Sequence, residues 1–82
     1  MVKQEYIIMD TSIKYMDAQN PLQEGLLYMG EGMWSRKLDL AMKFDSVSAV
    51  TTEARNLSAN APVKVFLIQN EGNRIGIADV PF

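Results

Sequence analysis

The most constraining feature of this sequence is a short segment whose two alternating faces are both apolar. Residues 5–10 read Glu-Tyr-Ile-Ile-Met-Asp, and their aromatic and β-branched side chains favour an extended strand. Because successive side chains of a strand point to opposite faces, apolar residues at consecutive positions need cover on both sides. We therefore expect this strand to lie inside a sheet and not at its edge.

Three further segments predict strands. Residues 26–29 form a short apolar run between two glycines, and we expect them to pair with the first strand. Residues 63–69 alternate in the clearest strand pattern of the chain. Residues 74–80 then return as a hairpin partner after a four-residue turn at 70–73, in which Gly72 can take a positive φ.

Two helices are expected between the second and third strands. Residues 36–43 predict a short helix capped by Ser35, and residues 47–59 predict an amphipathic helix. One long helix from Arg36 is the alternative, but residues 45–46 (Asp-Ser) compete with helical hydrogen bonds and favour a break. Asn60 can take the left-handed closing position of the second helix.

This order of elements predicts an α+β fold in a single domain that spans residues 1–82. The expected architecture is a mostly antiparallel four-stranded sheet, ordered β-β-α-β-β along the chain, with both helices packed on one face. One helical layer covers one face only. Tyr6 or Tyr28, together with Phe66 and Ile68, would then lie on an open face, and such apolar patches mark association. A homodimer or a tight complex is the expected state.

Composition excludes several classes of function. The chain has no cysteine and no histidine, which removes disulfides, thiolate nucleophiles, the commonest zinc ligand and the commonest general base. The net charge of −2 provides no basic excess for binding nucleic acid directly. The first residues lack the apolar run of a signal peptide, and no stretch approaches the roughly 20 apolar residues of a membrane helix. We expect a cytoplasmic protein with no cofactor, no metal and no catalytic activity.

Two weak candidates for chemistry remain. The turn at residues 30–32 (Gly-Glu-Gly) follows a strand, but it lacks the third glycine of a dinucleotide fingerprint and the lysine of a phosphate loop. It is interpreted as a turn that needs unusual dihedrals. Asp10 and Asp79 both lie at expected strand ends, where they could share a site, although solvated turn positions explain them as well.

Aromatic and methionine side chains offer the better site hypothesis. Tyr28, Met33 and Trp34 flank the glycine turn, and Tyr15 and Met16 lie in the irregular segment 11–23. Tyr and Trp are enriched at interface hot spots, and Met suits adaptable surfaces. The competing interpretation is that they fill a thin core. The predicted partner-binding residues are Tyr15, Met16, Tyr28, Met33, Trp34, Phe66 and Ile68.

The stretch from Tyr28 to Ile68 resembles a pattern found in short, uncharacterised bacteriophage proteins. In that pattern a Gly-x-Trp turn, here Gly32 to Trp34, leads through an Ala-x-x-Phe turn, here Ala41 to Phe44, into one helix and a strand. Some such phage proteins bind and disable a host enzyme or defence complex. The resemblance implies a phage protein in the host cytoplasm, and it assigns no binding residues.

These observations leave three functional hypotheses. The first is an inhibitor of a host nucleic-acid enzyme or an immune effector such as a CRISPR complex, acting by steric occlusion of a host protein. The second is an oligomer that sequesters a small ligand or nucleotide. The third is a minor structural or assembly protein of a virion.

Overall fold

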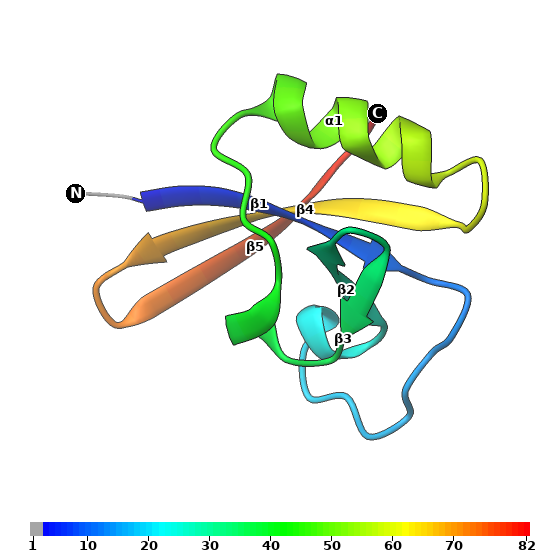
Figure 1. The fold of residues 1–82 in the computed structure, drawn as a ribbon. Coiled ribbons are helices and arrows are strands. Elements are labelled where there is room, and N and C mark those ends of the chain that lie inside the picture. The colour runs from blue at the N-terminus through cyan, green and yellow to red at the C-terminus, as the bar shows by residue number, and fades with distance from the viewer. Residues whose placement is uncertain (1–2) are drawn as a thin grey trace.

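The computed structural model describes residues 3–82, so Met1 and Val2 of the chain's start lie outside the described residues. One antiparallel sheet has the strand order β3-β2-β1-β4-β5 (Figure 1). Its strands are β1 (Lys3–Asp10), β2 (Leu26–Gly30), β3 (Met33–Ser35), β4 (Val63–Glu71) and β5 (Arg74–Val80). One helix, α1 (Val47–Leu57), and two 3-10 turns, η1 (Pro21–Gln23) and η2 (Leu38–Leu40), complete the fold. The α+β class and the antiparallel sheet are confirmed, whereas the expectation of four strands and two helices is wrong.

β1 is the central strand, as its two apolar faces predict. Tyr6, Ile7, Ile8 and Met9 are all buried. β1 pairs with β4 along its whole length, from Lys3 opposite Asn70 to Asp10 opposite Val63. With β2 it pairs only at Met9 and Asp10, because the two strands then diverge.

Residues 41–44 fill the gap between the diverging strands. Phe44 and Tyr6 exchange two backbone hydrogen bonds of 2.9 Å, and the Met42 amide donates to the Tyr28 carbonyl at 2.8 Å. The expected helix at 36–43 is therefore wrong, since only η2 is helical. A helix there would satisfy its own amides but leave the buried backbone groups of Tyr6 and Tyr28 without partners, which is costly. Ser35 caps a turn instead, where its hydroxyl accepts from the Lys37 amide.

α1 covers one face of the sheet and packs against β1 and β4. Val50 and Ala54 are fully buried there, in a cluster with side chains of both strands. α1 begins directly after residues 45–46, as expected, because the Ser46 hydroxyl accepts from the Ala49 amide as the N-cap, but no α-helix precedes it among the described residues. The helix ends at Leu57, two residues earlier than expected, and Asn60 does not take a left-handed conformation. The expected left-handed closure is wrong.

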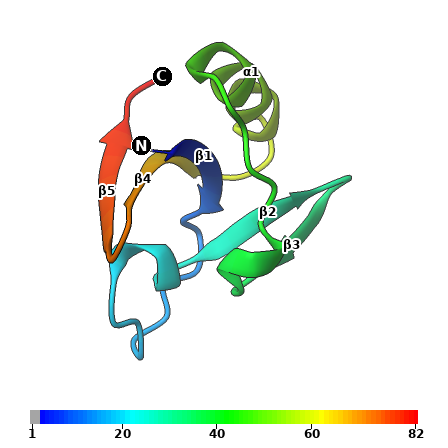
Figure 2. The same cartoon turned by 90° about the vertical axis from the view of Figure 1, so that its left-hand side faces the viewer.

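The opposite face is covered as well. η1 contributes Leu22, and the chain around η2 contributes Leu38 and Ala41, which pack on Phe66 and Ile68 of β4. Figure 2 shows α1 at the top of the view and the cyan η1 segment at the bottom. Phe66 and Ile68 are each 4% exposed, so the expectation that they lie on an open face is wrong. Short turns supply this second layer, although their sequences carry no periodic apolar pattern.

The β4–β5 hairpin is confirmed, with a tighter loop than expected. β4 runs on to Glu71, which pairs with Arg74, so the loop is Gly72-Asn73 alone. Gly72 has φ +61°, whereas φ of Asn73 is not positive. A positive φ at the first loop residue alone is the pattern of a type II′ turn. This loop fixes the register of β5.

Gly25 provides a test of the packing between β1 and β2. A Cβ atom there would collide with the Asp10 carbonyl and lie 2.8 Å from Met9 Cγ, whereas at Gly76 the nearest atom is 3.7 Å away. We expect Gly25→Ala to lower the free energy of unfolding by about 1–3 kcal/mol, the usual cost of overpacking. Gly76→Ala, the matched control, should change it by less than about 1 kcal/mol. Chemical denaturation of both variants measures this, and equal stabilities would contradict the described packing.

Candidate functional site

The seven predicted partner-binding residues do not form one surface. Tyr28 is 6% exposed and belongs with Phe66 and Ile68 to the core, whereas Met33 is 51% and Met16 91% exposed. Tyr15 and Trp34 are half-buried. Burial therefore divides the set into core residues and residues that a partner can reach.

Trp34 contributes to the core. Its ring packs on Tyr28 with centroids 5.1 Å apart and a tilt of 57°, a favoured aromatic geometry, at the border of the cluster under α1. The Tyr28 hydroxyl in turn donates to Glu53 Oε1 at 3.3 Å and joins β2 to α1. The aromatic pair holds the β2–β3 hairpin against the helix.

The tip of this hairpin has unusual backbone geometry. Gly30, Glu31 and Gly32 have φ values of +95°, +53° and +75°, and the pairing register shifts between Tyr28 and Gly30. Positive φ at both loop residues, Glu31 and Gly32, is the type I′ pattern. The left-handed conformation costs a residue with a Cβ, here Glu31, roughly 1–2 kcal/mol. The interpretation of residues 30–32 as a turn with special dihedrals is confirmed.

A groove of about 490 Å³ lies beside this tip, and we name it the methionine groove. It is lined by Tyr28, Met29, Gly30, Glu31, Met33, Met42 and Glu53. Met33 and Met42 are 51% and 43% exposed, and the two charged lining residues, Glu31 and Glu53, are both acidic. The groove thus combines flexible thioether side chains with negative charge.

Sequence patterns identified Tyr28 and Met33 but missed Met42 and Glu53. Met42 fell in the expected short helix, and it reaches the groove only because residues 41–44 pair with β1 and β2. The sequence signal available for Met42 was the methionine content, six residues in 82.

Tyr15 belongs to a separate cluster. The Arg36 guanidinium lies 3.7 Å from the centre of the Tyr15 ring and forms an ion pair with Asp17 at 2.7 Å. Because Arg36 directly follows β3, these contacts tie the irregular segment to the chain after β3, and the Tyr15 amide also donates to the carbonyl of Glu24, just before β2. The hydrogen bond from Arg36 lowers the pKa of Asp17 from its ordinary value of 3.8.

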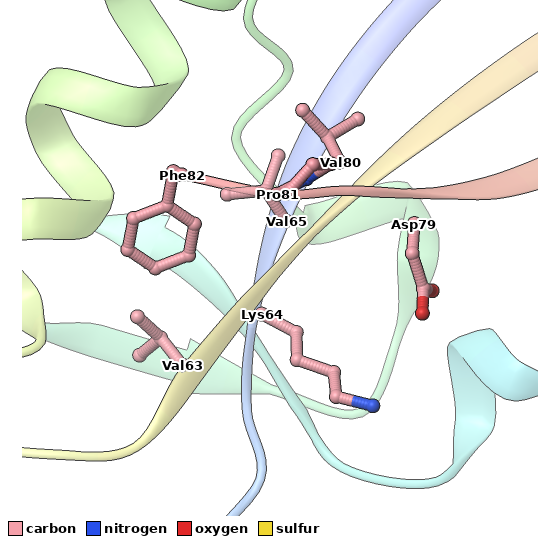
Figure 3. A pocket seen from close by; sticks show the side chains of 7 residues that line it. All are labelled: Val63, Lys64, Val65, Asp79, Val80, Pro81 and Phe82. Carbon is pink, nitrogen blue, oxygen red and sulfur yellow. The ribbon is translucent and has the colours of Figure 1, made fainter.

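A second hollow, of about 460 Å³, lies at the end of β5 (Figure 3). The Phe82 ring and Val63 lie on its helix side, while Lys64 and Asp79 point away from them. Val65, Val80 and Pro81 complete its lining. It is an open apolar depression with polar groups on one side.

The structure separates the two carboxylates that could have shared a site. Asp10 and Asp79 occupy opposite faces of the sheet, as the register across β1, β4 and β5 shows, so they do not share a site. Asp10 instead accepts from the amide and the hydroxyl of Ser12. Among the described residues, no three Asp or Glu side chains gather where they could hold a metal ion.

No family model, curated protein or solved structure matches this chain. Over the described part of the chain, no helix has the length and apolar character needed to cross a membrane.

The Arg36–Asp17 pair provides a pH test of the irregular segment. Since the folded pKa of Asp17 lies below 3.8, the pair stabilises the fold at higher pH, and this contribution is lost as pH falls through the folded value. We expect Arg36→Gln to raise the pKa of Asp17 towards 3.8, which the pH titration of its side-chain carboxyl carbon by NMR would show. An identical Asp17 pKa in wild type and variant would contradict the pairing.

Proposed function

We propose that this chain is a non-enzymatic binding protein whose methionine groove docks onto a partner protein. The observation that carries the proposal is the position of Met33 and Met42, two half-exposed methionines beside the carboxylates of Glu31 and Glu53. A single exposed apolar residue is ordinary on a protein surface. Several exposed apolar residues that line one groove, beside charged residues of a single sign, favour a docking site.

The groove chemistry favours a basic, partly apolar partner. Methionine is unbranched and polarisable, so it adapts to the shape of an apolar anchor. Glu31 and Glu53 would complement lysine or arginine at the rim of that anchor and speed the encounter. Basic surfaces are common on proteins that bind nucleic acid, because they neutralise phosphates. This complementarity supports an inhibitor that occludes a host nucleic-acid enzyme or an immune effector.

The strained turn supports the same site. Glu31 has φ +53° at an exposed tip, and strained non-glycine residues are concentrated where a fixed geometry serves function. Glycine would relieve this strain but remove the carboxylate. The proposal assigns Glu31 the role of holding negative charge at the edge of the groove.

A synthetic amphipathic helix of leucine and lysine, with about five turns, serves as the probe of this proposal. We expect it to bind the protein, and the double change Met33→Ser with Met42→Ser should weaken binding about tenfold or more, the scale of lost anchor contacts. Met16→Ser, at a residue 91% exposed that does not line the groove, is the control and should leave affinity unchanged. Isothermal titration calorimetry measures all three proteins.

The charge requirement is tested with the same probe. Glu31→Gln with Glu53→Gln should weaken binding and flatten its salt dependence, because both carboxylates of the groove are neutralised. The amide introduced at position 53 keeps an oxygen that can accept from the Tyr28 hydroxyl, so the link between β2 and α1 is retained. Affinity that is unchanged in both double variants would refute the site.

The hollow at Phe82 supports a second candidate, the sequestration of a small ligand. Its volume of about 460 Å³ falls in the range of small-molecule sites, and Lys64 and Asp79 could orient a polar end. This candidate is the better account if small apolar molecules saturate the protein at this hollow and the helical probe does not bind.

A further inference from the structure

The outer edge of β5 is the longer of the two open edges of the sheet. β3, at the other edge, has three residues, whereas β5 has seven, of which all but Ile77 and Val80 are exposed. An open strand edge presents rows of unpaired backbone donors and acceptors to another chain. This edge is distinct from the methionine groove.

The hairpin register determines which backbone groups point outward. In a two-residue hairpin the residues that flank the loop exchange both backbone hydrogen bonds, and bonded pairs then alternate along the strands. Glu71 and Arg74 flank the loop, so alternate residues from Arg74 onward bond to β4. The residues that direct their N–H and C=O groups to the open edge are Ile75, Ile77 and Asp79.

β5 lacks the features that protect natural edge strands. Within Arg74–Val80 there is no proline, the register with β4 has no bulge, and the charges lie near the two ends, at Arg74 and Asp79. Ile75 is 59% exposed on the same face as Ile77, which packs against the core cluster. Proteins that keep an edge free usually place a charge or a proline at such a position.

The edge is complementary to itself. We propose that a second copy of this chain pairs with it in antiparallel orientation about a twofold axis near Gly76. In this register Ile75 of each copy lies opposite Ile77 of the other, on the face away from α1. Arg74 of each copy then lies opposite Ala78 of the other, so opposite charges, Arg74 and Asp79, come to adjacent register positions with side chains on opposite faces of the sheet. Parallel pairing would bring like charges together.

The isoleucine pairs extend an existing apolar surface. Ile75 and Ile77 line a groove of about 560 Å³ together with Leu22 and Leu38, and three of these four residues already belong to or pack on the core under the 3-10 turns. The second strand would continue this apolar layer. The dimer thus forms at an edge, and the open apolar face that first suggested association does not exist.

Sedimentation equilibrium over a range of micromolar concentrations tests the proposal. We expect a reversible shift from the 9.2 kDa monomer to twice that mass. Ile75→Lys should weaken dimerisation about tenfold or more, since two apolar cross-strand pairs are lost at once. Met16→Lys makes the same change of charge at an exposed residue away from β5 and should dimerise as the wild type does.

Amide hydrogen exchange of the wild type locates the contact without any variant. The amides of Ile75 and Ile77 should exchange rapidly in the dilute monomer and slowly in the concentrated protein, whereas Gly76 and Ala78 stay protected in both. A chain that remains monomeric at high micromolar concentration would overturn the proposal. So would a dimer in which the Ile75 and Ile77 amides still exchange rapidly, because it must form elsewhere.

Discussion

Four consecutive side chains of β1, from Tyr6 to Met9, are removed from water, and the rest of the structure follows from this burial. Neighbouring side chains of a strand face opposite ways, so two apolar layers are needed. α1 provides one layer through Val50 and Ala54. Within residues 3–82, no long helix or strand provides the second apolar layer. Two 3-10 turns, η1 and η2, provide it through Leu22 and Leu38. A chain of this size covers both faces of its sheet only by using its connections as core.

Because both faces of the central strands are covered, the two proposed contact surfaces lie at the ends of the sheet. The strand order places the β2–β3 hairpin at one end and β5 at the other. The methionine groove lies at the first and the open strand edge at the second, so the proposed partner contact and the proposed self-association do not compete. A dimer through β5 would present two methionine grooves, and two linked contacts raise the apparent affinity for a partner that offers two sites.

Local patterns predicted the elements whose signals are local. The two-sided apolar run of β1, the Ser46 cap of α1 and the return of β5 after Gly72 each depend on residues adjacent in sequence. Residues 36–43 were mispredicted because their apolar spacing fits a helix, while distant hydrogen bonds to Tyr6 and Tyr28 determine the outcome. β3 was missed for a related reason, since three residues form a strand only because the turn at Glu31 returns them to β2.

The candidate site was predictable only in part. Tyr28 and Met33 flank the glycine turn in the sequence and were identified, but their exposures differ because Tyr28 faces α1 and Met33 faces solvent. Met42 enters the groove through tertiary pairing that no local pattern encodes. Phe66 and Ile68 were assigned to an open face because the covering turns carry no periodic signal.

The central claim is that the face of the sheet opposite α1 is core, and the stability of Phe66→Ala tests it most directly. Phe66 is 4% exposed and Ile75, on the same face, is 59% exposed, which makes Ile75→Ala the matched control. The account predicts that Phe66→Ala lowers the free energy of unfolding by about 3–5 kcal/mol, while Ile75→Ala, measured as a monomer, changes it by less than about 1 kcal/mol. A Phe66→Ala protein that unfolds at the same denaturant concentration as the wild type would mean that this face is open, and would contradict the account.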